Sequence, residues 1–156
     1  MAIKINTEKR IFTLETKHTM YQMQADTYGV LRHLWYGAKT GCDMSYLQDY
    51  PDVGFSGNPH DAGNDRTYSL DTLPLEYAGA GIGDFRVPAV EAVHADGSCA
   101  LDLRYYSYTV KQGKYAIAGL PALYAGEDEA ETLEVVLRDT ASAVEVTLKY
   151  GVLPEL

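Results

Sequence analysis

The side chains best suited to chemistry gather in one polar stretch, residues 49–67, with the sequence DYPDVGFSGNPHDAGNDRT. It combines carboxylates, one arginine, aromatic rings and side-chain amides: Asp49, Asp52, Asp61, Asp65, Arg66, Tyr50, Phe55, Asn58 and Asn64. Sites for sugars use this combination, because carboxylates and arginine bind pairs of hydroxyl groups and an aromatic ring covers the apolar sugar face. A solvated loop in which Asp and Asn only cap turns has the same composition, so the residues alone leave both interpretations open.

Other kinds of site find little support in the sequence. Gly79, Gly81 and Gly83 lack the glycine spacing of a dinucleotide-binding loop, and no lysine follows as in a phosphate-binding loop. The four histidines are not spaced as local metal ligands, and Cys42 and Cys99 do not complete such a set. No nucleophile elbow is present, and no carboxylate pair stands out for glycoside hydrolysis. Two carboxylates distant in the sequence can still meet in the fold, so the residues alone leave that chemistry open. We expect no metal and no cofactor in this chain.

The overall charge narrows the possible partners. The chain has 156 residues and a formal net charge of −9. Nucleic acid and anionic lipid surfaces need clustered Lys and Arg, which the sequence lacks, so we expect neither partner. No segment approaches the roughly 20 apolar residues of a membrane span, and the first residues lack the apolar region of a secretory signal. Two widely separated cysteines then favour free thiols in a cytoplasmic protein.

Short strands are expected in most of the first part of the chain. Residues 3–6 and 10–15 are candidate strands, and residues 19–25 alternate in side-chain type. The region 27–29 turns the chain into residues 30–36, which are rich in β-forming side chains.

A long loop is expected at residues 41–68, because two prolines and four glycines accompany several Asp and Asn residues. Within it, only residues 44–49 could form a turn or two of helix. Long loops in compact domains are uncommon and often functional, which adds weight to residues 49–67. A second irregular segment is expected at residues 73–84.

Strands are expected again at residues 88–95, 99–111, 132–138 and 143–153. Asp96-Gly97 is a hairpin signal, residues 112–115 form a turn, and residues 127–131 form an acidic turn or linker. The last two strands should pair as a hairpin around Asp139-Thr140. The pattern predicts one all-β domain over residues 1–156, built as an antiparallel β-sandwich.

Several motifs in a fixed order resemble the N-terminal domain of glycoside hydrolase family 36 α-galactosidases. These motifs are YGVLRHLWYG (28–37), FSGNP (55–59), NDRTYSLDTLPLEY (64–77), GDFR (83–86), Pro88-Ala89, GLPALY (119–124) and EAETLE (129–134). The similarity extends from about Arg10 to Pro154 in the order of the family, which is more specific than any single motif.

The resemblance implies that the chain is the first part of a large β-supersandwich and ends before the catalytic (β/α)8 barrel. In the full enzyme, two barrel aspartates hydrolyse terminal α-galactosides with retention. The segment alone is then expected to contain no catalytic residue and not to be an enzyme. Its expected role is structural, within a homo-oligomer that is a tetramer in the full enzyme, and its partners are its own barrel and an α-galactoside.

The resemblance also implies roles for individual residues. In family tetramers the loop before SLDTLP reaches a neighbouring subunit's substrate pocket, which makes Asp52 and Arg66 substrate-binding candidates. Tyr50, Phe55 and Asn58 are weaker candidates for the same pocket.

Two alternative functions stay open. A free-standing carbohydrate-binding β-sandwich would bind sugar as a lone chain, and a purely structural interaction module would self-associate without sugar.

Overall fold

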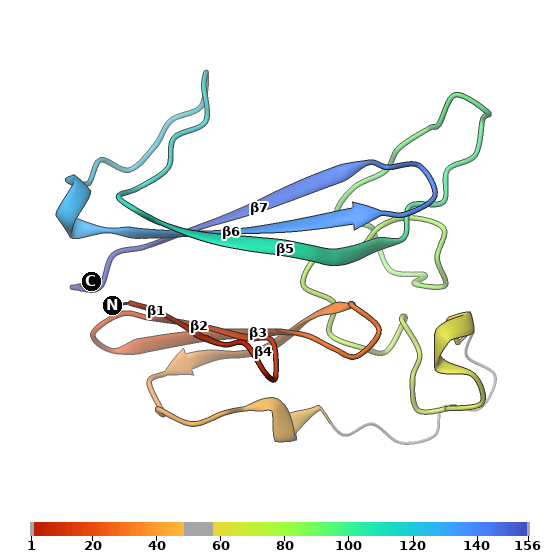
Figure 1. The fold of residues 1–156 in the computed structure, drawn as a ribbon, viewed down its shortest axis with the longest axis horizontal. Coiled ribbons are helices and arrows are strands. Elements are labelled where there is room, and N and C mark those ends of the chain that lie inside the picture. Colours follow the sequence, from red (N-terminus) through yellow and green to blue (C-terminus); the bar gives the residue numbers. More distant parts are fainter. Residues whose placement is uncertain (1, 49–57, 156) are drawn as a thin grey trace.

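The computed structural model describes residues 2–48 and 58–155, and two antiparallel sheets lie face to face in it (Figure 1). The first sheet contains β1 (Ile3–Asn6), β2 (Ile11–Glu15), β3 (Thr19–Ala25) and β4 (Leu31–Ala38) in chain order. The second contains β5 (Leu103–Gln112), β6 (Glu131–Asp139) and β7 (Glu145–Val152). Single turns of 3₁₀ helix lie in the connections, namely η1 (Ser45–Leu47), η2 (His60–Ala62) and η3 (Glu127–Glu129). The predicted all-β antiparallel sandwich is confirmed.

Each strand of the first sheet pairs with the next along the chain, because a short turn joins them. Asn6 accepts a backbone N–H across the first turn at 3.0 Å, and the hydroxyls of Thr16 and Thr19 bond across the second at 2.8 Å. In the β3–β4 turn, Oδ1 of Asp26 accepts two backbone N–H groups, both at 2.9 Å. Gly29 follows with φ +79°, a conformation that favours glycine.

The core lies between the sheets and follows the two-residue alternation of the strands. β6 is the central strand of its sheet, and its Leu133, Val135 and Leu137 are almost completely buried. Phe12 of β2 and Met23 of β3 pack into the same cluster from the first sheet. Successive side chains of a strand point to opposite faces, so the alternation that predicted β6 marks its inner face.

A carboxylate fixes the first strand to the second sheet. Oε2 of Glu131, at the start of β6, accepts the N–H groups of Ala2 and Ile3, both at 2.9 Å. Ala2 and Ile3 are buried, so these N–H groups need partners inside the protein.

The connection between the sheets runs from residue 39 to residue 102, and its described part is largely irregular. Residues 39–48 run along the outer face of the first sheet, and residues 58–102 lie at one end of the sandwich (Figure 1). Buried irregular backbone needs hydrogen-bond partners outside a strand ladder. Arg86 supplies two of them by donating to the carbonyls of Leu70 and Leu73, both at 2.8 Å. Asp84 holds this guanidinium at 2.9 Å, and the hydrogen bond from Arg86 keeps the pKa of Asp84 below its usual value.

Glu76 ties the same connection to both sheets. Its carboxylate accepts the hydroxyl of Tyr21 in β3 at 2.6 Å and that of Tyr150 in β7 at 2.7 Å. Nδ1 of His33 lies 3.5 Å away, and the Glu76 side chain is only 7% exposed. Burial, followed by the neighbouring carboxylate, raises the pKa of both tyrosines, because an ionised tyrosine here would be dehydrated and repelled.

The strand predicted at residues 88–95 is wrong. Val90 makes a single bridge to Gly79, and no ladder follows. The alternation has another cause, because Val90 and Ala92 pack against the core while Val93 is exposed. An extended segment lying on a core shows the same pattern as a strand.

The other elements differ less from expectation. The turn at Asp96-Gly97 is formed, with Gly97 at φ +84°, but no strands flank it. β5 begins at Leu103 instead of residue 99. Of the remaining predicted strands, β1 and β3 have the predicted bounds, and the others differ at their ends by one or two residues. The turn of helix that residues 44–49 could form is present as η1. In 2–48 and 58–155, no helix has the length and apolar character needed to cross a membrane.

Gly79 packs closely against the backbone of Leu101, because a Cβ on residue 79 would lie 2.1 Å from the carbonyl oxygen of Leu101. We expect Gly79→Ala to lower the free energy of unfolding by about 2–3 kcal/mol, since backbone must move. Gly126→Ala is the control, because its Cβ would meet only the flexible Glu129 side chain, at 3.4 Å or more. Equal urea midpoints for the two variants would contradict the close approach.

The raised pKa values of Tyr21 and Tyr150 predict a loss of stability at high pH. The unfolded chain releases these protons first, near the ordinary tyrosine value of about 10, so their contribution is full below that pH and falls above it. We expect the double variant Tyr21→Phe, Tyr150→Phe to lose about 2–4 kcal/mol at neutral pH, because Glu76 loses two donors. Its stability should then fall less steeply in alkali.

Urea midpoints measured from neutral to alkaline pH check both effects. Tyr124→Phe is the control, because the Tyr124 side chain is exposed. A double variant with the alkaline slope of the unaltered chain would show that these two hydroxyls do not carry the effect.

Candidate functional site

The described part of the polar stretch, residues 58–67, is a compact turn that closes on itself. The side-chain amide of Asn58 donates to the carbonyl oxygen of Asp65. Oδ1 of Asp65 accepts the N–H and the hydroxyl of Thr67, at 3.0 and 2.6 Å. Arg66 is the central residue of this aspartate turn and is exposed. The hydrogen bond from the Thr67 hydroxyl lowers the pKa of Asp65, so the carboxylate stays ionised near neutral pH.

The turn is anchored on both sides. Near its start, η2 inserts Ala62 into a small apolar cluster with Val30 and Leu70. After it, Tyr68 is buried, and its hydroxyl donates to Oδ2 of Asp26. The backbone that carries Arg66 is therefore held at two points by the β3–β4 turn and the sheet connection.

Asp26 is the buried acceptor at the base of the turn. It is 6% exposed and accepts the N–H groups of Tyr28 and Val30 as well as the Tyr68 hydroxyl. Nε of Arg32 lies 3.5 Å from Oδ2 and balances its charge. Burial, followed by the hydrogen bond to Asp26, raises the pKa of Tyr68, so its hydroxyl remains a donor.

Arg104 of β5 connects the second sheet to this region. Its Nε and Nη2 bind both carboxylate oxygens of Asp102, at 2.6 and 3.0 Å. Its Nη1 donates to the carbonyl of Tyr28 at 3.0 Å and lies 3.5 Å from Oδ2 of Asp61 in η2. Burial would lower the pKa of Arg104, but Asp102 and Asp61 outweigh it and the pKa is raised.

The structure describes two of the predicted site residues. Arg66 is exposed in the turn. The side-chain amide of Asn58 donates to the backbone carbonyl of Asp65, the residue before Arg66. Asp52, Tyr50 and Phe55 lie outside the described residues. The turn-capping interpretation therefore accounts for Asn58 and Asp65.

The anchoring residues were missed from the sequence. Asp26 had a local signal, because Asp followed by Tyr28-Gly29 is typical of a turn capped by its own aspartate. Asp102 and Arg104 are separated by two positions in an extended segment and so point to the same side. Nothing local in the sequence indicated that either group would meet residues 61–68.

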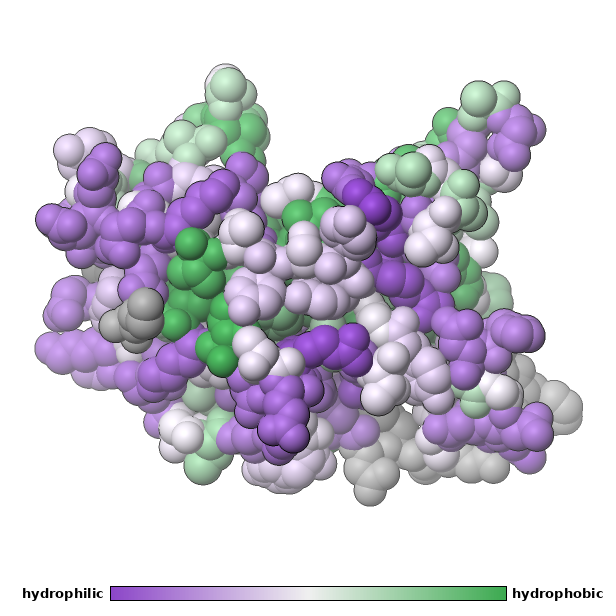
Figure 2. Space-filling model, viewed as in Figure 1, coloured by the Kyte–Doolittle hydropathy of each residue, from purple (hydrophilic) through white to green (hydrophobic). Residues whose placement is uncertain are grey.

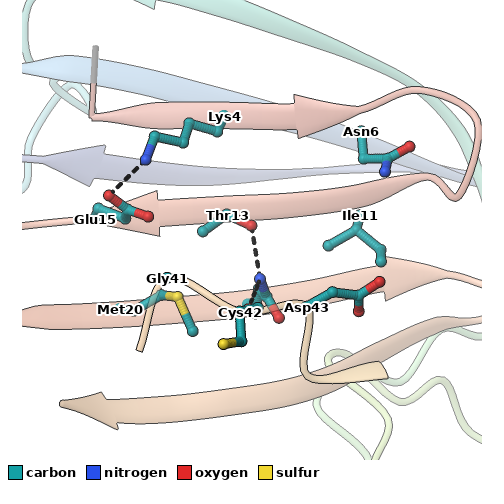
Figure 3. A pocket seen from close by; sticks show the side chains of 10 residues that line it. Lys4, Asn6, Ile11, Thr13, Glu15, Met20, Gly41, Cys42 and Asp43 are labelled. Carbon is teal, nitrogen blue, oxygen red and sulfur yellow. Dashed lines mark hydrogen bonds and ion pairs between the residues drawn. The ribbon is translucent and has the colours of Figure 1, made fainter. Parts of the chain in front are cut away.

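A second polar surface lies on the outer face of the first sheet, as a hollow of about 200 Å³ (Figure 3). Glu15 binds Lys4 at 2.9 Å and Lys39 at 2.7 Å, and Gln22 donates to the carbonyl of Cys42 at 3.1 Å. Burial would raise the pKa of Glu15, but the two lysines lower it. These groups satisfy one another, so the arrangement fixes the segment after β4 to the sheet.

The chain also carries an apolar projection, residues 114–126, between β5 and β6. Figure 2 shows apolar side chains along it, away from the body of the protein. The exposed ones are Ile117, Leu120, Leu123 and Tyr124, and Tyr124 is 91% exposed. Exposed apolar side chains gathered on one segment are typical of an interaction surface.

Metal chemistry is not indicated in the part of the chain that the structure describes. It contains no group of three or more His, Cys, Asp or Glu side chains arranged to hold a metal ion. Cys42 and Cys99 are both exposed free thiols.

Known proteins resemble this chain along most of its length. A profile described as "Glycosyl hydrolase family 36 N-terminal domain" matches residues 29–156. The bifunctional α-galactosidase/sucrose kinase AgaSK of Mediterraneibacter gnavus is 54% identical over 155 residues, which are 99% of this chain and 17% of that protein.

Solved structures agree with the sequence matches. The galactosidase domain of AgaSK superposes with a TM-score of 0.95, covering 99% of this chain and 21% of that one. A variant of the α-galactosidase AgaA from Geobacillus stearothermophilus, solved in complex with raffinose, is 39% identical with a TM-score of 0.86, covering 93% of this chain and 20% of that one. The chain spans about a fifth of the length of these relatives. Because the profile covers most of the chain and the shared fold nearly all of it, the chain belongs to glycosyl hydrolase family 36, as its N-terminal domain.

Proposed function

We propose that this chain works as the N-terminal β-sandwich of an α-galactosidase, next to a catalytic barrel that hydrolyses terminal α-galactosides with retention. The observation that carries the proposal is the 54% identity and the TM-score of 0.95 to the galactosidase domain of AgaSK, along 99% of the chain. In this role the chain supplies structure and part of a pocket, and the barrel supplies the catalytic groups.

The polar stretch 49–67 completes the substrate pocket of a neighbouring subunit in this proposal. Its substrate-binding residues are Asp52 and Arg66, with Tyr50, Phe55 and Asn58 as further contacts. The exposed Arg66 in a closed turn supports this role. A guanidinium offers paired donors to sugar hydroxyls, and a turn that is already ordered loses little entropy on binding.

The proposal includes a homo-oligomer, a tetramer for the full enzyme, in the cytoplasm. The apolar projection supports a contact with another subunit or with the barrel, because its exposed side chains gain by leaving water. The two exposed free cysteines fit a reducing compartment.

The first test compares the chain alone with a chimera. The chain alone is expected to hydrolyse no chromogenic α-galactoside above the blank. In the chimera this chain replaces the matching residues of the AgaSK galactosidase domain, and we expect activity within about tenfold of the parent, because the two folds superpose. A folded chimera without activity would refute the proposal, and saturable raffinose binding by the lone chain would favour a free-standing sugar-binding module.

The second test is Arg66→Ala in the chimera. We expect kcat/KM for raffinose to fall about 10- to 100-fold, because a charged hydrogen bond to the sugar is lost. Arg138→Ala is the matched control, since Arg138 lies on β6 and pairs with Glu145. An effect of Arg66→Ala no larger than that of the control would exclude Arg66 from the pocket.

A further inference from the structure

We propose that Arg104 and Asp61 are positioning residues, which orient the turn that carries Arg66 and so set how well that arginine meets the sugar. The inference rests on the proposed function of Arg66. It concerns residues that the sequence did not single out as a pair, from the second sheet and from η2.

The first step is the fixed orientation of the Arg104 guanidinium. Asp102 holds two of its nitrogens, and the carbonyl of Tyr28 accepts from the third at 3.0 Å. Asp102 lies directly before β5, two residues before Arg104, and Tyr28 belongs to the β3–β4 turn. The planar group is thus oriented from both sheets before it meets the loop, which a flexible lysine would not achieve.

The second step is the contact between Arg104 and η2. Nη1 of Arg104 lies 3.5 Å from Oδ2 of Asp61, and the Arg104 side chain is 15% exposed. Partial burial weakens solvent screening at the arginine end, so the charge pair favours one orientation of η2. Ala62, the next residue, is the apolar anchor of the same helical turn.

Backbone hydrogen bonds connect the orientation of η2 to that of Arg66. The carbonyl of Ala62 accepts the N–H of Asp65 at 3.1 Å, and the N–H of Tyr68 donates to the carbonyl of Asp65 at 3.2 Å. With the bonds of Asp65 to Asn58 and Thr67, these make η2 and the turn one hydrogen-bonded unit. A rotation of η2 therefore moves the backbone of Arg66 with it.

The buried residues and the exposed Asp61 hold this unit in different ways. Tyr68 with Asp26, and Ala62 with its apolar neighbours, hold the unit on the body of the protein. The Asp61 side chain is 54% exposed, so its loss leaves those anchors in place and releases only the orientation. Asp61→Asn is therefore expected to leave the fold stable and to change only how firmly the turn is oriented.

The first measurement uses the 156-residue chain and trypsin, which cleaves after Arg66. We expect Asp61→Asn to raise the cleavage rate at Arg66-Thr67 about threefold, because a unit that is no longer held in one orientation presents this bond to the protease more often. Asp128→Asn, an exposed change in η3, is the matched control and should leave the rate unchanged. Equal rates at this bond for Asp61→Asn and the unaltered chain would overturn the inference.

The second measurement is a double-mutant cycle in the chimera, with raffinose as substrate. Asp61→Asn is expected to raise KM about threefold and leave kcat unchanged, because ground-state and transition-state binding weaken together. In an Arg66→Ala background the same change should have no effect, since the group that it positions is gone. A purely structural Asp61 would give additive losses, which would overturn the inference.

The two proposals fail in different ways. An inactive chimera, or one insensitive to Arg66→Ala, refutes the pocket role, and the trypsin result still judges whether Asp61 orders the turn. An active chimera that depends on Arg66, with additive Asp61 and Arg66 effects, refutes the positioning role alone.

Discussion

Buried carboxylates that accept several donors hold the irregular connection to the sandwich, and the rest of the structure depends on them. Asp26 closes the β3–β4 turn and accepts the Tyr68 hydroxyl, and Glu76 accepts one tyrosine hydroxyl from each sheet. A carboxylate leaves water only at a large cost, which several charge-assisted hydrogen bonds offset. Each therefore specifies a single arrangement of its donors, and a connection without a strand ladder acquires a defined path across the open end of the sheets.

The sequence was informative where one local pattern has one structural solution. The alternation in β6 and β7, the glycine turns and the β-rich run of β4 each predicted an element that is formed. The strand predicted at residues 88–95 was wrong. Alternation indicates which side chains face a core, but it does not indicate whether a neighbouring strand supplies hydrogen bonds. The family resemblance rested on motif order along the chain, which needs no knowledge of pairing and so was confirmed.

In the candidate site, too, local features were predictable from the sequence and long-range contacts were not. Residue types in one stretch made Arg66 and Asn58 candidates, and local turn chemistry explains how Asp65 shapes the backbone around Arg66. The supports come from 42 residues before Tyr68, in the case of Asp26, and from a different sheet, in the case of Arg104. Contacts of that range depend on the packing of the two sheets, and no local spacing encodes them.

The self-closed turn also has an evolutionary consequence. Its shape is fixed by hydrogen bonds among residues 58–68 and by anchors in η2, at Tyr68 and in the sheets, and these bonds do not use the side chain at position 66. An exchange of that side chain would leave these bonds in place. Lineages can then change the chemistry presented at this position while the turn stays constant, so that the exposed side chain evolves separately from the scaffold.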